Sequence, residues 1–205
     1  ISAGGQRGYI QGAQLEYVAA DQIKVESGTI EIAGSFYTRT SYSTTIDTDT
    51  AGHWVEGASQ RAVSTWAYVY AYNDSDSTYD VKYWLQAPQY ANTGTDDSSV
   101  KIYRQNASVW YRCLGAVRMD AVGSGNILNF YQRGNLIMWD IPITVTTATS
   151  AGAWSGAISC SAGMPAISTF GIFGVAVTGG SAPTASAIRP NGSTWVPANN
   201  TGSNP

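Results

Sequence analysis

Hydrophobic and polar residues alternate along much of this chain with a period of two, which is the repeat of a half-buried β-strand. The clearest case is Ser64–Tyr72, in which Trp66 and three tyrosines alternate with Ala67, Val69 and Ala71. Successive side chains of a strand point to opposite faces, so this segment predicts one aromatic and one aliphatic face. We therefore expect a strand that is covered on both sides and lies at the centre of a sheet.

Two further alternating segments predict hairpins. Tyr79–Leu85 resumes the alternation after the polar turn Asn73–Thr78, so it is expected to pair with the central strand. Nearer the N-terminus, Ile23–Glu26 and Ile30–Ile32 alternate on either side of Gly28. We interpret Gly28 as the turn of a second hairpin, one side of which faces water.

A third hairpin is predicted near the middle of the chain. Leu114–Val117 precedes the turn sequence Gly123–Asn126, and Ile127–Tyr131 then returns to strand-favouring residues. The two arms are expected to pair with each other.

Shorter alternating or apolar segments complete the predicted set of strands. They are Phe36–Thr40, Thr44–Ile46, Val100–Arg104, Leu136–Trp139, Ile141–Thr147, Ala157–Cys160 and Ile167–Val177. Together with the hairpins they make about a dozen strands without a helical period, which predicts an all-β fold. We expect an antiparallel, jelly-roll-like β-sandwich, and an immunoglobulin-like sandwich remains an alternative that lacks that family's Cys, Trp, Cys spacing.

The chain of 205 residues suits a single domain of this kind. Residues 1–14 are rich in glycine and predict an N-terminal arm or docking segment. The β-sandwich is expected to span residues 15–197, and residues 198–205 are expected to fray.

Charge and hydropathy argue against two classes of partner. The net charge is −3 and the eleven Lys and Arg residues are scattered, so no basic surface for nucleic acid is expected. No apolar run reaches the roughly 18 residues that span a bilayer, so no membrane partner is expected.

Few residues offer reactive or metal-binding chemistry. Cys113 and Cys160 are the two cysteines, and we expect Cys113 to be buried in a strand, although a bridge between the two stays open. His53 has no neighbouring Ser or Cys nucleophile and is read as a packed or surface residue.

Aspartates that are close in sequence are read as turn formers, with a hard cation such as Ca²⁺ as the alternative. They are Asp47, Asp49, Asp74, Asp76, Asp80, Asp96 and Asp97. Convergent carboxylates for glycoside cleavage are not evident, so we predict no catalytic residue, no metal and no cofactor, and a protein that is not an enzyme.

Three tryptophans in expected loops, Trp54, Trp154 and Trp195, are the candidates for contact with a glycan or a partner. The flat face of an indole ring matches the apolar face of a pyranose. The same residues suit the core or a contact between subunits, and the sequence leaves these readings open.

Four segments resemble, in order, motifs of a family of bacteriophage virion modules found in tail-fibre, appendage and capsid-decoration proteins. Arg7–Gly12 resembles their opening motif, and Ile23–Gly28 resembles the strand and turn that follow. Thr65–Tyr70 is similar to their aromatic strand. Tyr111–Gly134 resembles their strand with a basic residue before Leu-Gly, followed by a Phe-x-Gln-x-Gly arm.

This resemblance implies a non-enzymatic structural protein exposed on the virion, as a tail appendage, a fibre or a capsid decoration. It also implies a homotrimer that contacts other virion proteins and a host surface glycan. A lectin-like carbohydrate-binding module and a polysaccharide-degrading tail protein are the alternatives.

Overall fold

A computed structural model describes residues 9–40, 45–73, 78–90, 101–121, 123, 125–134, 136–141, 143, 160–168 and 171. Apart from the short 3₁₀ helix η1 (Ala51–His53), the regular elements of these residues are β-strands. The strands are β1 (Ile10–Gly12), β2 (Leu15–Ala19), β3 (Gln22–Val25), β4 (Gly28–Ile32), β5 (Ser35–Arg39), β6 (Thr45–Asp47), β7 (Trp66–Asn73), β8 (Tyr79–Trp84), β9 (Tyr103–Asn106), β10 (Val109–Arg118), β11 (Phe130–Arg133) and β12 (Leu136–Trp139). The predicted all-β class is confirmed.

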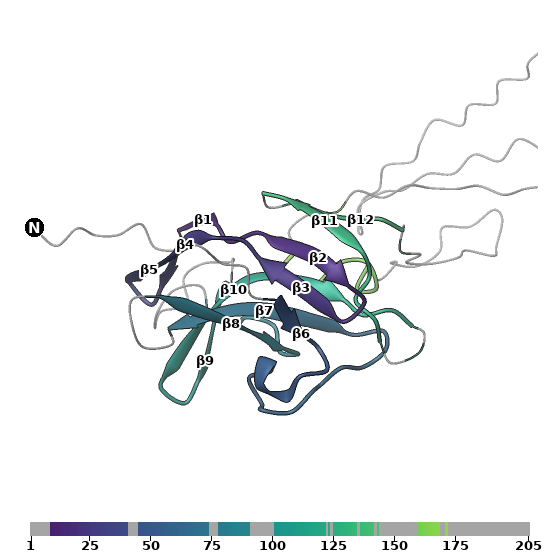
Figure 1. Ribbon diagram of the computed structural model, residues 1–205, viewed down its shortest axis with the longest axis horizontal. Coiled ribbons are helices and arrows are strands. Elements are labelled where there is room, and N and C mark those ends of the chain that lie inside the picture. The colour runs from purple at the N-terminus through teal and green to yellow at the C-terminus, as the bar shows by residue number, and fades with distance from the viewer. Residues whose placement is uncertain are drawn as a thin grey trace, which may run out of the picture.

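The strands pair antiparallel in four sheets that stack as two layers (Figure 1). One layer is the four-stranded sheet β8-β7-β10-β9. Opposite it lie β1-β4-β5 and β2-β3-β6, with the hairpin β11-β12 beside β2. The packing is sandwich-like, while a jelly-roll strand order stays a prediction.

The strand β7 lies at the centre of its sheet, as its alternation predicts. It pairs with β8 from Tyr68↔Trp84 to Asn73↔Tyr79, so the predicted hairpin is confirmed, and with β10 on its other edge. Its aliphatic residues Ala67, Val69 and Ala71 are fully buried in the core between the layers. They pack there with isoleucines and valines from the opposite layer.

The aromatic face of the β7 sheet forms a second hydrophobic cluster on the far side from the core. The segment at residues 160–168 contacts this face through hydrogen bonds to the aromatic side chains. The indole Nε1 of Trp66 donates to the carbonyl of Ser161 at 2.8 Å, and the amide of Ala166 donates to the hydroxyl of Tyr68 at 3.3 Å. Polar atoms of the rings are thereby satisfied where the rings are buried.

The prediction of a hairpin that turns at Gly28 is wrong, because Gly28 lies within one strand of a longer hairpin. Residues 10–19 pair with residues 22–30, from Ile10↔Ile30 through Gly12↔Gly28 to Leu15↔Val25. The ladder continues between these registers, since the amide of Ala13 donates to Ser27 at 3.0 Å and that of Glu26 donates to Gln14 at 2.9 Å. The turn lies at residues 20–21, and Gly28 marks a kink at which both strands pass from one sheet to another.

Two glycines make this kink sterically feasible. A Cβ on Gly28 would lie 2.4 Å from the carbonyl oxygen of Gln11 and 2.5 Å from the amide nitrogen of Ala13. A Cβ on Gly12, whose φ is +73°, would lie 2.3 Å from the oxygen of Ser27. Main-chain atoms cannot swing away as a flexible side chain does, so a side chain at either position forces the two strands apart.

The polar side predicted for Ile30–Ile32 is also wrong, because Glu31 is buried with its two neighbours. The hydroxyl of Tyr103 on β9 donates to a carboxylate oxygen of Glu31 on β4, in the opposite layer. The guanidinium of Arg112 lies 5.3 Å from the ring centroid of Tyr103. Burial lowers the pKa of Arg112, whereas Tyr103, Cys113 and Glu31 act to raise it. A buried charge requires such partners, so this group ties the two layers together.

The third predicted hairpin is correct at its turn and wrong in its pairing. Met119 and Ile127 form an antiparallel bridge, and the amide of Leu128 donates to the carbonyl of Arg118 at 2.8 Å. Beyond this point β11 leaves β10 and pairs with β12, with Phe130 opposite Trp139. The partners of β10 are β7 and β9.

Other predictions meet the structure only in part. Residues 10–12 of the expected N-terminal arm form β1, and residues 1–8 and 198–205 lie outside the described residues. Nearly all of the predicted strands 141–147, 157–160 and 167–177 also lies outside them. Within the described part of the chain, no helix has both the length and the apolar character needed to cross a bilayer.

We expect Gly28→Ala to lower the free energy of unfolding by about 2–3 kcal/mol, because its methyl group would overlap main-chain atoms. Gly52→Ala is the matched control, since a Cβ there meets no atom within 4 Å, and its effect should stay within about 0.5 kcal/mol. Urea denaturation of the two variants measures the difference. Equal stabilities would show that the close approach of the two strands does not constrain the fold.

Alkaline pH should destabilise the protein through its buried tyrosines. Burial raises the pKa of Tyr70 and Tyr83 well above 10 and that of Tyr79 to about 12. An unfolded tyrosine ionises near pH 10, so the unfolded chain binds fewer protons than the folded one above that pH, and stability falls as pH rises. Urea midpoints measured from about pH 8 to 12 should decline above pH 10, whereas a flat profile would contradict the burial of these rings.

Candidate functional site

Trp54, the first tryptophan considered for glycan or partner contact, is a core residue. Its side chain is fully buried, its ring centroid lies 5.2 Å from that of Tyr83, and its Nε1 donates to the carbonyl of Thr48 at 2.8 Å. A ring enclosed in this way has no face to offer a sugar, so the packing interpretation holds for Trp54. Trp154 and Trp195 lie outside the described residues.

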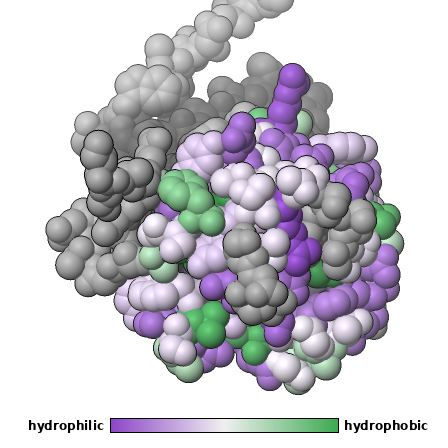
Figure 2. Space-filling view, turned by 60° about the vertical axis from the view of Figure 1, so that its left-hand side comes forward, coloured by the Kyte–Doolittle hydropathy of each residue, from purple (hydrophilic) through white to green (hydrophobic). Residues whose placement is uncertain are grey.

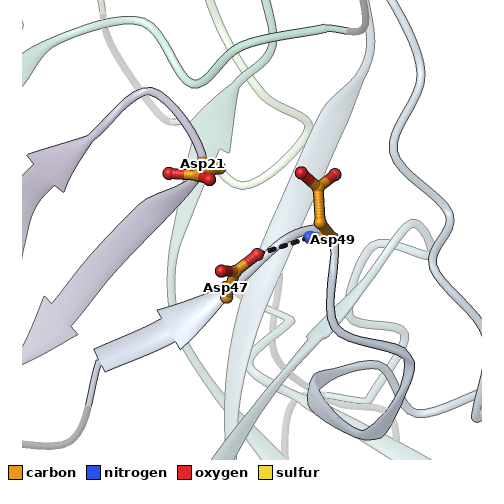
Figure 3. A group of neighbouring side chains, drawn as sticks. All are labelled: Asp21, Asp47 and Asp49. Atoms are coloured by element: carbon orange, nitrogen blue, oxygen red, sulfur yellow. Dashed lines mark hydrogen bonds between the residues drawn. The ribbon is translucent and has the colours of Figure 1, made fainter.

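Among the predicted acidic pairs, Asp47 and Asp49 come together with a third carboxylate, that of Asp21 (Figure 3). One oxygen of each lies within 4.8 Å of the others. Asp21 lies in the turn between β2 and β3, and Asp47 ends β6. Because Gln22 on β3 pairs with Asp47, the register itself brings Asp21 to this position.

The surroundings of these three aspartates already satisfy part of their charge. Arg61 donates from Nη1 to Asp49 at 2.6 Å, and Gln22 donates from Nε2 to Asp47 at 3.2 Å. The amide of Asp49 donates to Asp47 Oδ1 at 2.6 Å, as in an Asx turn. Oxygen ligands of this kind suit a hard cation, but the contacts present also serve a folded loop without one.

The residue His53 belongs to the same loop. Its Nδ1 accepts a hydrogen bond from the amide of Asp47 at 2.8 Å, so this nitrogen is engaged with the main chain. The interpretation of His53 as a packed residue agrees with this contact. Asp80 belongs to another predicted acidic group, and its Oδ1 lies 3.8 Å from Nη2 of Arg39. Residues 74, 76, 96 and 97 lie outside the described part of the chain.

The buried cysteine is confirmed. Cys113 lies within β10, no disulfide joins it to Cys160, and its thiol contacts the carbonyl of Gly115 at 3.4 Å. Burial raises the pKa of the Cys113 thiol to about 12, so the reactive thiolate is suppressed at neutral pH.

Large apolar side chains are exposed on and beside the hairpin β11–β12. Tyr131 and Met138 face each other across the two strands and are 60% and 46% exposed, and Ile141 is 70% exposed. On the side of the molecule that comes forward in Figure 2, hydrophobic residues form small patches among hydrophilic ones. Because of the exposure of Tyr131, Met138 and Ile141, the hairpin β11–β12 is our first candidate for a contact surface.

Comparison with models of protein families, with curated proteins and with solved structures finds no match to this chain.

Arg61 is expected to be the most important side chain of the acidic loop for stability. It also donates from Nε to the carbonyl of Gly125 at 2.9 Å and contacts Asn126, so it joins two loops that are distant in sequence. Arg61→Ala should lower the free energy of unfolding by about 2–3 kcal/mol, because several charge-assisted hydrogen bonds are lost.

Lys24→Ala is the control for the loss of an ion pair alone. Lys24 and Glu16 are 2.9 Å apart but exposed to solvent, so the change should cost less than about 1 kcal/mol. Urea denaturation of both variants at the same ionic strength measures the two losses of unfolding free energy. A loss for Arg61→Ala no greater than that for Lys24→Ala would contradict the structural role of Arg61.

Proposed function

We propose that this protein is a non-enzymatic structural component of a bacteriophage particle, exposed as a tail appendage, a fibre or a capsid decoration. In this proposal it assembles as a homotrimer, contacts other virion proteins and touches the host surface. The ordered series of motifs is the observation that carries the proposal, and the geometry of three of them supports it.

These three motifs lie at positions on which the folding of the chain depends. Ile23–Gly28 supplies the kink, Thr65–Tyr70 covers most of the central strand, and Tyr111–Gly134 contains β10 and β11. The residues of these motifs form the core and the kink, and such structural roles are expected when the motifs define a structural module. Arg7–Gly12 lies partly outside the described residues.

The acidic loop also favours a structural role over a hydrolytic one. Glycoside cleavage uses two carboxylates about 5–10 Å apart on either side of a bound sugar. Asp21, Asp47 and Asp49 instead gather at the end of one ladder, where Asp49 contacts Arg61. We therefore assign this loop to stability.

Self-association needs an exposed apolar surface that a second copy can cover. The outer strand of the β11–β12 hairpin, β12, consists of the uncharged residues Leu136–Trp139, and the exposed Met138 and Ile141 lie on and just beyond it. Within the described part of the chain β12 pairs with β11 alone, and an uncharged edge strand is a ready template for pairing with another chain. We place the contact between copies at this strand.

Electron microscopy of particles labelled with antibody against this chain tests the location. The proposal predicts label at the surface of tails or heads. Particles that carry no label, while the protein is found free in the lysate, would overturn it.

Light scattering after size exclusion tests the trimer and its contact. The wild-type chain and Phe36→Asp should give the mass of three chains, because Phe36 is 44% exposed on β5, away from β12. Met138→Asp should give monomers, since a buried unpaired charge is costly at an interface. A monomeric wild-type chain, or a trimer in both variants, would contradict the contact at β12.

A further inference from the structure

The hairpin β11–β12 lies beside β2 (Figure 1). Residues of β2 and β11 line a polar groove. Its volume is about 360 Å³, which is within the range of small-ligand pockets. Its lining includes Glu16, Tyr17, Glu26, Asn129, Tyr131 and Gln132.

The floor of the groove is held in place by side-chain contacts. Gln132 accepts a hydrogen bond at Oε1 from the amide of Leu15 at 2.8 Å and donates from Nε2 to the carbonyl of Gly134 at 2.9 Å. The ring of Tyr17 packs edge-on against Phe130, with centroids 6.4 Å apart. A ligand that binds here meets a largely preformed surface, which limits the entropy that binding costs.

The two walls of the groove are strand edges, so they present main-chain donors and acceptors together. The amide of Leu15 points toward β11, as its bond to Gln132 shows, and by the two-residue repeat of a strand the main-chain groups of Tyr17 point the same way. A hydroxyl group both donates and accepts a hydrogen bond. A ligand rich in hydroxyl groups therefore matches this mixed lining better than one with acceptors or donors alone.

One aromatic residue of the lining is exposed to solvent. Tyr131 on β11 is 60% exposed, and a flat ring of this kind packs against the apolar face of a pyranose. Asn129, Glu16 and Glu26 are polar residues of the same lining, although the amide of Asn129 also donates to Asp140 at 3.3 Å. Such a combination of one aromatic face with several planar polar groups favours a sugar ring.

The charge of the groove selects among sugars. Glu16 and Glu26 contribute two carboxylates, and none of the described residues that line the groove is Lys or Arg. The Nζ of Lys24 lies 2.9 Å from Oε2 of Glu16 and offsets the charge of that carboxylate. The carboxylate of Glu26 is therefore the group expected to repel an anionic ligand. Sialylated, sulfated and phosphorylated saccharides are therefore disfavoured.

We propose that the groove between β2 and β11 binds a neutral saccharide, with Tyr131 stacked on the ring and Glu26 excluding anionic sugars. The inference names a ligand class for the host contact and in that respect rests on the function proposed above. Trp54, one of the three tryptophans considered for glycan contact, is buried, and Tyr131 is an exposed aromatic residue that the alternation of the sequence does not mark.

The test is a titration of the isotopically labelled full chain with maltose, cellobiose, lactose and chitobiose, followed by amide chemical shifts. Saturable shifts at Tyr17, Asn129, Tyr131 and Gln132 are expected for at least one of these neutral sugars. Absence of saturable shifts with all four, or shifts confined to other strands, would overturn the proposal.

Three variants assign the roles of the residues. Tyr131→Ala should weaken binding of the same sugar by about two- to tenfold, the usual range for one aromatic contact. Tyr90→Ala removes an exposed tyrosine that lies beside β9 and should leave binding unchanged. Glu26→Gln should keep the neutral sugar and gain binding of sialyllactose.

Unchanged affinity in Tyr131→Ala, with the wild-type spectrum retained elsewhere, would contradict the stacking role. No gain of sialyllactose in Glu26→Gln would contradict the charge selection. These binding results do not depend on where the protein is found. If the antibody labels phage particles but the groove binds no sugar, only this inference is contradicted. If the protein binds sugar but is absent from particles, only the proposed function is contradicted.

Discussion

The fold depends on the close contact of Gly12 and Gly28, where two paired strands bend together. Antiparallel strands that keep their pairing across a bend must bring main-chain atoms within a distance that a Cβ does not allow. Glycine at both positions permits the bend, and the hydrogen bonds of Ala13 and Glu26 continue the ladder through it. One hairpin thereby contributes strands to two sheets, and both sheets face the layer built around β7.

The sequence pattern predicts many of the strands, but it misses β1 and β2 and does not give the strand partners. Alternation located β7 and β8 and their hairpin, because both the faces and the turn are encoded locally. The sequence around Gly28 predicts a turn because a kink and a turn demand the same residue type, and only the pairing with Gly12 distinguishes them. The burial of Glu31 depends on Tyr103 in the other layer, a contact that no local pattern contains.

The candidate sites follow the same division. The pairing of β3 with β6 adds Asp21 to Asp47 and Asp49, and the docking of β11 beside β2 creates the groove. Both are products of register and packing between segments distant in sequence. Trp54, which the sequence marks as conspicuous, serves the core, whereas the less conspicuous Tyr131 is exposed at the proposed site.

Amide hydrogen exchange in the native protein tests the continuous, kinked hairpin most directly. If the ladder passes through the kink, the amides of Ala13 and Glu26 should exchange as slowly as those of β3 and report the global free energy of unfolding. Fast exchange at these two amides, with slow exchange in the strands on either side, would show two separate ladders joined by a loose connection and would contradict the account.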